Sequence, residues 1–381
     1  MKHVALLLHG YQPPTQDLRL VEEIDRQCYL PVSRLLRETG ARVAVNVNWS
    51  LTEQLLATGS ETPGLLGGAE GVEFTDSGAY HPILPLLDAA DVERQLRINR
   101  ASNAAALGGR YAPVGVFPPE MAWGRSLAPI LSRMGYRWSV TDDVPWCWAG
   151  NAAPYDRIVT QDGLPVFLRS NFWSNRISFH GEDGRETVRD IASGMTGWAG
   201  SGDSYLLVAM DMETFGHHRP GTVERFLAPF LDELSGMGEA RLSTPSELLG
   251  IFPPMEGTVP AGSWSTGPAD LEAGKPWPLW SDPDNPVHVA LRDLLERVVS
   301  IAREHGWERV APSADKMVYS CPFWWASAGR FDAVQVRRGL LAILETALAV
   351  FVGSGDRAML DDVMTAVCGI PAVTGEERRN A

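Results

Sequence analysis

Short apolar runs alternate with longer amphipathic stretches over the first two thirds of the chain. A run of four to six mostly apolar residues predicts a buried strand, and apolar residues at every third or fourth position predict a helix. Strands that alternate with helices are typical of parallel strands joined by crossover helices. The predicted strands cover residues 4–8, 42–47, 71–74, 114–117, 138–141, 166–169 and 205–210. About seven units of this kind are consistent with a closed or nearly closed α/β barrel.

The predicted helices lie between these strands and have recognisable ends. They cover residues 18–39, 91–107, 127–134, 186–195 and 222–234. A further helix is expected to begin at Thr244, because Pro245 and Glu247 follow it as in a capping box.

The composition changes after Phe252, which predicts three parts in the chain. Residues 1–252 form the barrel. Residues 253–286 are rich in Pro, Gly and Ser and contain Trp264, Trp277 and Trp280, so we expect an ordered connecting loop. Residues 287–381 contain helical patterns at 291–304, 334–352 and 358–367, which predict a C-terminal helical domain.

Charge and cysteine content narrow the class of protein. The 381-residue chain is 45% hydrophobic and carries a formal net charge of -14, which argues against a nucleic-acid partner. Its four cysteines are far apart and none has CxxC spacing, so neither a cysteine zinc site nor a disulfide scaffold is expected. The first apolar run is too short for a signal peptide, and no run reaches the ~20 residues of a membrane span. We expect a cytoplasmic protein without a membrane partner, while the oligomeric state stays open.

Polar side chains follow the predicted strands. In a parallel barrel such side chains meet at one mouth. The set comprises His9, Gln12, Asn48, Glu73, Glu120, Asp142, Asp143, Asp211, Glu213, His217 and His218. Glu120 and Asp211 each follow an apolar strand closely, and two carboxylates across a barrel mouth fit glycoside hydrolysis. The 13 tryptophans exceed the 12 phenylalanines and 8 tyrosines, and their faces can either pack a core or stack on sugar rings.

The chain resembles glycoside hydrolase family 57 in a set of motifs that occur in the family's order along nearly the whole chain. The motifs are QPP at 12–14, GVE at 71–73, YHPILPL at 80–86, FPPEMAW at 117–123, DMETFGHH at 211–218 and SCPFWWAS at 320–327. The first motif departs from the family pattern, since His9-Gly10-Tyr11-Gln12 has one histidine fewer.

The resemblance implies a (β/α)7-type incomplete barrel followed by a helical region. It also implies retaining action on α-glycosidic bonds in α-glucans or oligosaccharides, with a carbohydrate as partner and no metal or other cofactor. Glu120 matches the family's nucleophile and Asp211 its general acid/base. The matching substrate-binding positions are His9, Gln12, Glu73, His81, Trp123, Glu213, His217, Trp324 and Trp325.

Other interpretations of the same residues stay open at this stage. The histidines, with Asp211 and Glu213, could hold a metal in a hydrolase or deacetylase built on a similar barrel. The chain could also be a carbohydrate-binding protein without catalysis. Glu120 and Asp211 could be turn, cap or salt-bridge residues, and Trp324-Trp325 could belong to a core.

Overall fold

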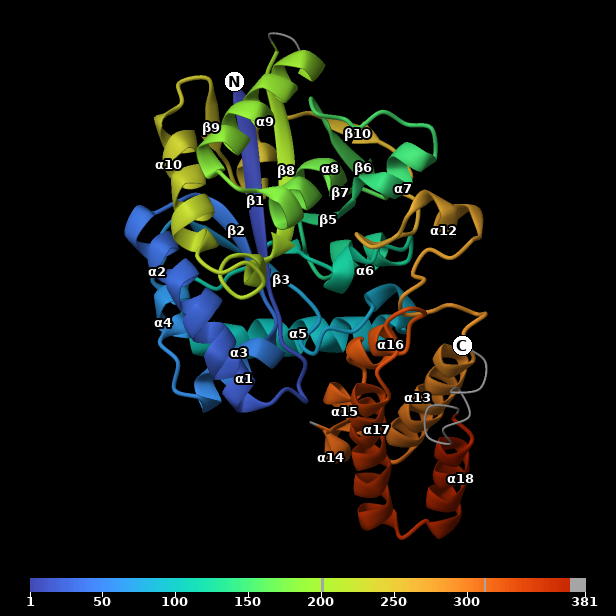
Figure 1. The fold of residues 1–381 in the computed structure, drawn as a ribbon. Helices are drawn as coiled ribbons and strands as arrows, with labels where there is room; N and C mark the ends of the chain where they lie inside the picture. The colour runs from blue at the N-terminus through green and yellow to red at the C-terminus, as the bar shows by residue number, and fades with distance from the viewer. Residues whose placement is uncertain (200–201, 312, 371–381) are drawn as a thin grey trace. The chain divides into compact units, whose positions relative to one another are not determined.

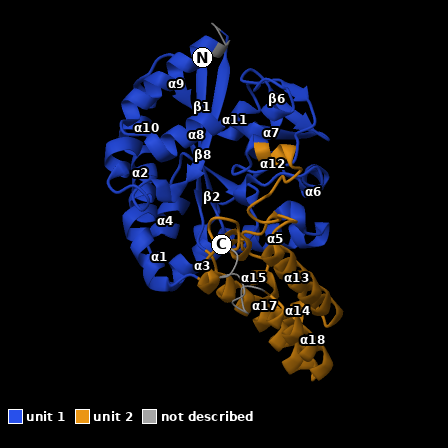
Figure 2. Ribbon diagram, turned by 45° about the vertical axis from the view of Figure 1, so that its right-hand side comes forward, with its two compact units in different colours: residues 1–12, 16–79, 84–268 blue, residues 13–15, 80–83, 269–381 orange. Residues whose placement is uncertain are grey.

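The computed structural model describes residues 1–199, 202–311 and 313–370 of the chain. The described residues divide into two compact units, which Figure 2 distinguishes by colour. Unit 1 contains residues 1–12, 16–79 and 84–268. Unit 2 contains residues 13–15 and 80–83 and the chain from residue 269 onwards.

A closed ring of parallel strands forms the centre of unit 1 (Figure 1). Within the described residues, seven strands follow one another around it: β1 (Lys2–Gly10), β2 (Val43–Val47), β3 (Val72–Asp76), β4 (Gly115–Val116), β5 (Trp138–Asp142), β7 (Leu164–Arg169) and β8 (Ser204–Asp211). β8 returns to β1 over eight register positions, whereas β7 meets β8 only at Arg169 and Leu207. The predicted seven-stranded α/β barrel is therefore confirmed, and its ring closes at this single pairing.

Three further strands of the described residues extend this sheet and were not predicted. They are β6 (Ile158–Gln161), which is antiparallel to β7, β9 (Ala240–Leu242), which pairs with β1, and β10 (Pro254–Glu256), which pairs with β6. Each has only three or four residues.

Alternation along the strands creates two apolar layers. In β1, Val4, Leu6 and Leu8 belong to the cluster that packs against the surrounding helices. Ala5 and Leu7 belong to the cluster inside the barrel, together with Phe117. Successive strand side chains point to opposite faces, so a buried strand must be apolar on both.

The helices of unit 1 alternate with the strands. They are α1 (Leu18–Ile24), α2 (Leu30–Thr39), α3 (Trp49–Ala57), α4 (Thr62–Gly67), α5 (Ala89–Leu107), α6 (Leu127–Arg133), α7 (Asp143–Trp148), α8 (Asn171–Asn175), α9 (Gly184–Ala199), α10 (Ala228–Gly236) and α11 (Pro245–Leu248). Helix α12 (Pro268–Glu272) belongs to unit 2 except for its first residue. The capping box at Thr244 and Glu247 is present at the start of α11. No helix in the described residues is both long and apolar enough to cross a membrane.

Two predicted elements differ from the structure in a way that matters for the site. The predicted helix 18–39 is interrupted between α1 and α2 by a π-helical segment, η1 (Asp25–Tyr29). The predicted strand 71–74 instead continues to Asp76 as β3. Glu73 therefore stands near the beginning of a strand, and the expectation that it ends one is wrong.

Unit 2 is built from helices. They are α13 (Pro286–Glu304), α14 (Trp307–Val310), α15 (Ser313–Lys316), α16 (Cys321–Trp325), α17 (Ala333–Ser354) and α18 (Arg357–Cys368). The long helices match the predicted helical patterns, while residues 371–381 of the predicted domain lie outside the described residues.

Gly115 leaves room for the Trp138 indole inside the barrel. A Cβ atom at Gly115 would lie 2.0 Å from the ring of its register partner, Trp138. We expect Gly115→Ala to destabilise the protein by about 1–3 kcal/mol, because the buried ring must shift. Chemical denaturation measures this cost. Gly109→Ala is the matched control, since a Cβ there has nothing within 4 Å, and an equal loss in both variants would contradict the packing argument.

Candidate active site

The carboxyl ends of the barrel strands bring polar side chains from distant parts of the chain to one mouth. In the register of the sheet, His9 of β1 pairs with Asn46 of β2 on one side and with Asp211 of β8 on the other. Parallel strands finish at the same end of a barrel, so the residues that follow them share that end. The predicted strand-end residues His9 and Asp211 are brought together in this way.

Glu120 is held in an unusual backbone conformation just after β4. It has φ 60° and ψ 16°, and the next residue, Met121, also has a positive φ of 50°. Such left-handed conformations cost energy for residues other than glycine and are concentrated at functional sites. Trp264 stabilises the Glu120 conformation with two hydrogen bonds. Its backbone N–H donates to the Glu120 carbonyl at 3.2 Å, and its indole Nε1–H donates to Glu120 Oε2 at 2.7 Å.

Asp211 ends β8 and lies near a buried cation, Arg169, at the end of β7. The Arg169 guanidinium donates to the Ala209 carbonyl at 2.8 Å and to Asp142 Oδ2 at 2.6 Å. It also lies over the Trp264 ring, 5.6 Å from its centroid. Arg169 thus contacts the strand that carries Asp211 and the tryptophan that binds Glu120.

A third acid, the buried Glu213, lies two residues after Asp211. Its carboxyl accepts hydrogen bonds from the Tyr29 hydroxyl and from Gln12 Nε2, the latter at 3.1 Å. Tyr29 comes from η1, whose Cys28 thiol also donates to the Met212 carbonyl. The π-helical segment therefore supports the turn that follows β8.

His9 is a buried, uncharged histidine. Its Nδ1 lies 2.6 Å from Asn46 Oδ1, so Nδ1 carries the hydrogen and donates. Burial lowers the pKa of His9 to about 4, and the hydrogen bond to Asn46 opposes this shift. The ring stacks on Phe117 at 4.5 Å between centroids, and Trp264 meets both rings edge-on.

Burial raises the pKa of the three carboxyl groups at the mouth. For Glu120 it raises the pKa to about 8, with a further contribution from the charge of Asp211 and an opposing one from the Trp264 hydrogen bond. For Asp211 the pKa rises to about 6, against the effect of Arg169. Burial and the Asp211 charge raise the pKa of Glu213 to about 8. Glu120 and Asp211 together therefore hold one proton between about pH 6 and pH 8.

Three other predicted residues of unit 1 have different surroundings. Glu73 accepts hydrogen bonds from the backbone and hydroxyl of Ser246 at the start of α11, so the structure does not bring it to the strand ends. Trp123 is fully buried in the apolar cluster that contains Leu127. His217 lies beside Gln27, with its Nδ1 2.7 Å from Oε1, and is partly exposed.

His81, Trp324 and Trp325 belong to unit 2. His81 has a positive φ of 61° and binds Ser320, with Nδ1 3.0 Å from the hydroxyl oxygen. The Arg330 guanidinium lies over Trp324 at 4.8 Å, and Trp325 meets Tyr319 edge-on at 6.4 Å. The role of these three residues in substrate binding stays a prediction.

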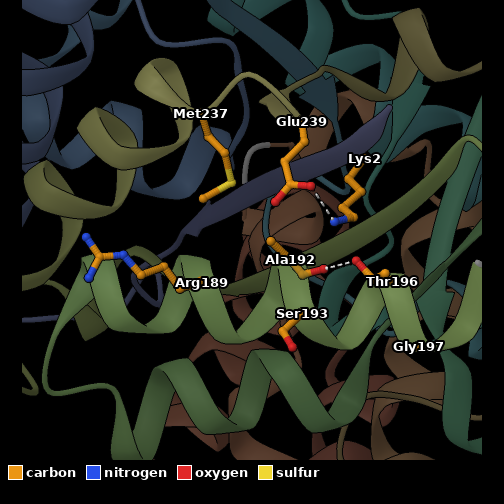
Figure 3. Close-up of a pocket in the computed structure, with 8 residues that line it drawn as sticks. All are labelled: Lys2, Arg189, Ala192, Ser193, Thr196, Gly197, Met237 and Glu239. Carbon is orange, nitrogen blue, oxygen red and sulfur yellow. Dashed lines mark hydrogen bonds and ion pairs between the residues drawn. The ribbon is translucent and has the colours of Figure 1, made fainter. Parts of the chain in front are cut away.

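Two further observations concern metal ligands and a cavity at the other end of the barrel. Among the described residues, no group of three or more His, Cys, Asp or Glu side chains is arranged to hold a metal ion. A cavity of about 430 Å³ is drawn in Figure 3, where Lys2 and Glu239 form an ion pair. Lys2 begins β1, so this cavity lies at the amino ends of the strands, opposite the carboxyl ends that carry Glu120 and Asp211.

Sequence reasoning missed several residues of the site. Arg169 follows the apolar run 166–168. It would have been found by the same criterion as Glu120 and Asp211, namely a polar residue that follows an apolar strand. Tyr29 gave no signal, because a tyrosine on an amphipathic helix is ordinarily a packing residue. Trp264 was noted only as part of the connecting loop, and its contact with Glu120 spans 144 positions.

Comparison with known proteins places these features in context. Residues 8–259 match the family model of glycosyl hydrolase family 57. No curated protein sequence matches the chain.

Several solved structures share the fold. The 4-alpha-glucanotransferase from Thermococcus litoralis has a TM-score of 0.73 at 19% identity, over 91% of this chain and 60% of that chain. A GH57 branching enzyme from Thermococcus kodakaraensis has a TM-score of 0.72 at 16% identity, over 97% and 95% of the two chains. The alpha-amylase AmyC from Thermotoga maritima has a TM-score of 0.70 at 13% identity, over 96% of each. This chain thus spans about 60% of the length of the glucanotransferase and nearly the full length of the other two. At these identities the likeness is one of fold.

The hydrogen bond from Trp264 predicts a measurable shift in the titration of Glu120. Trp264→Phe removes a donor that favours the ionised carboxylate, so the pKa of Glu120 should rise further, by roughly 0.5–1. Infrared difference spectra of carboxyl bands, with Glu120→Gln to identify the Glu120 signal, measure the shift. Tyr29→Phe is the control, because it removes a donor from Glu213 instead. An unchanged Glu120 titration in Trp264→Phe would contradict the assigned hydrogen bond.

Proposed function

The chain belongs to glycosyl hydrolase family 57, and on this premise we propose that it is a retaining glycoside hydrolase or transglycosidase acting on α-linked glucans or oligosaccharides. The proposal rests above all on Glu120 and Asp211, two half-buried carboxyl groups that follow the barrel strands β4 and β8 at their carboxyl ends. Similarity of fold to a glucanotransferase, a branching enzyme and an amylase supports the substrate class.

The proposed reaction has two displacements. In the first, the Glu120 carboxylate attacks the anomeric carbon, the glycosidic bond breaks, and Asp211 gives its proton to the leaving oxygen. In the second, Asp211 takes a proton from water or from a sugar hydroxyl, and that oxygen displaces Glu120 from the anomeric carbon. Water gives hydrolysis and a sugar hydroxyl gives transfer, with the α configuration retained in both.

Attack requires that the shared proton lie on Asp211, whereas in the free protein Glu120 has the higher pKa. Positive charge that develops at the anomeric carbon favours the required arrangement, because it stabilises the carboxylate beside it. The Trp264 indole N–H has the same effect on Glu120. The enzyme thus gains its productive charge state as the transition state forms.

The neighbouring residues have supporting roles in this proposal. Glu213 stays protonated at neutral pH, so that it adds no second negative charge beside Asp211. Neutral His9 orients a sugar hydroxyl at the floor of the mouth, where Phe117 and Trp264 support its ring. His217, His81, Trp324 and Trp325 are proposed to bind more distant sugar units.

We also propose a cytoplasmic location. Cys28, Cys147 and Cys368 form no disulfide with one another, which is in keeping with a reducing compartment.

Substitution of the two carboxylates tests the mechanism. Glu120→Gln should lower kcat on α-glucans by about a thousandfold or more, because the nucleophile is lost. Asp211→Asn should impair glucan cleavage but still form the glycosyl-enzyme from a fluorosugar, whose leaving group needs no proton. Mass spectrometry of the trapped protein should find the label on Glu120. Full activity of Glu120→Gln, or a label on another residue, would overturn the assignment.

The shared proton predicts a bell-shaped pH profile. Below about pH 6 both carboxyl groups are protonated and no nucleophile exists, and above about pH 8 both are ionised and no acid exists. kcat/KM on a soluble α-glucan should therefore fall on both sides of this range. A profile with a single limb between pH 4 and pH 10 would contradict the carboxyl pair.

A further inference from the structure

Helix α17 belongs to unit 2 and is labelled in Figure 1. Its sequence places apolar residues on two opposite faces. One face packs into the unit through Val336, Gly339, Leu340, Ile343, Thr346, Ala347 and Val350. On the other face Val334, Leu341, Leu348 and Val352 are exposed at 59%, 58%, 46% and 84%. An apolar helix face is normally buried against another element, so the exposed face requires an explanation.

The exposed residues form one straight stripe. Val334, Leu341 and Leu348 recur every seven residues, and Val352 follows one turn later. Seven-residue spacing keeps side chains on one side of a helix, as in the contact seam of a coiled coil. At 1.5 Å per residue the stripe is about 27 Å long. Phe331, 41% exposed, lies just before the helix.

Charged side chains flank the stripe in a particular order. Arg338 lies three residues before Leu341, and Glu345 lies four residues after it. Both are exposed. They therefore carry opposite charges at nearly equal distances on the two sides of Leu341.

We propose that this stripe is the contact surface for a second copy of the chain, with the two α17 helices antiparallel and a two-fold axis beside Leu341. A two-fold axis pairs residues that lie equally far on either side of it. It places Leu341 against its own copy and Val334 against Leu348, and it brings Phe331 of one copy close to Val352 of the other. Arg338 of each copy then faces Glu345 of the other, so the apolar and charged patterns are satisfied by one register.

The size of the stripe determines how tightly the two copies are expected to associate. A single pair of helices buries less than the roughly 1,600 Å² of a standard interface, so a dissociation constant on the order of 10 µM is expected. The dimer should be seen at 100 µM and should dissociate on dilution.

Charge reversal tests both the surface and the register. In sedimentation equilibrium of the full chain, Arg338→Glu and Glu345→Arg should each weaken association about tenfold or more, because two like-charge pairs form. The double variant Arg338→Glu/Glu345→Arg should restore it, since both pairs regain opposite charges. Leu341→Arg should abolish association.

Matched surface variants separate this contact from general effects of charge. Arg357→Glu on α18 and Leu56→Arg on α3 change exposed residues outside the stripe and should leave association unchanged. Circular dichroism and activity on α-glucans report that each variant is folded. A wild-type chain that is monomeric at 100 µM, or association that survives Leu341→Arg, would overturn the interface. A double variant that stays monomeric would overturn the antiparallel register.

Discussion

The rest of the site depends on one constraint: the carboxyl groups of Glu120 and Asp211 are held at the end of the barrel with little access to water. Each of the strands β4 and β8 leads to an acid that is costly to ionise in its surroundings. Between about pH 6 and pH 8, Glu120 keeps its proton and Asp211 is ionised. The pair then carries the one proton and one negative charge that the proposed reaction needs, although the proton must lie on Asp211 when Glu120 attacks.

The remaining features of the mouth limit the cost of this arrangement. Trp264 supports both the strained backbone of Glu120 and one of its carboxyl oxygens, so one residue secures position and charge together. Arg169 supplies positive charge close to Asp211 without approaching the solvent. The segment that carries Trp264 follows the barrel in sequence, yet it is as much a part of the site as the strand ends themselves.

Most of the barrel could be predicted from the sequence because its strands are buried on both faces. Such strands read as uninterrupted apolar runs, and the residues that follow them, Glu120 and Asp211, are identified by position alone. The same rule failed for Glu73. Because β3 contains the polar residues Glu73 and Thr75, its sequence is not a continuous apolar run, and the pattern did not reveal that the strand ends at Asp76. Partners that act across the fold, such as Tyr29 for Glu213 and Trp264 for Glu120, depend on tertiary contacts that no local pattern encodes.

The π-helical segment η1 also constrains how the chain can change over evolutionary time. A π turn accommodates one residue more than an α turn, so α1 and α2 are offset by about 100° from the positions that one regular helix would give them. Tyr29 and Cys28 lie in this segment and contact the turn after β8. Loss of a single residue here would restore a regular helix and rotate both side chains away from the turn, so insertions and deletions should be far rarer in this helix than its exposed flanks suggest.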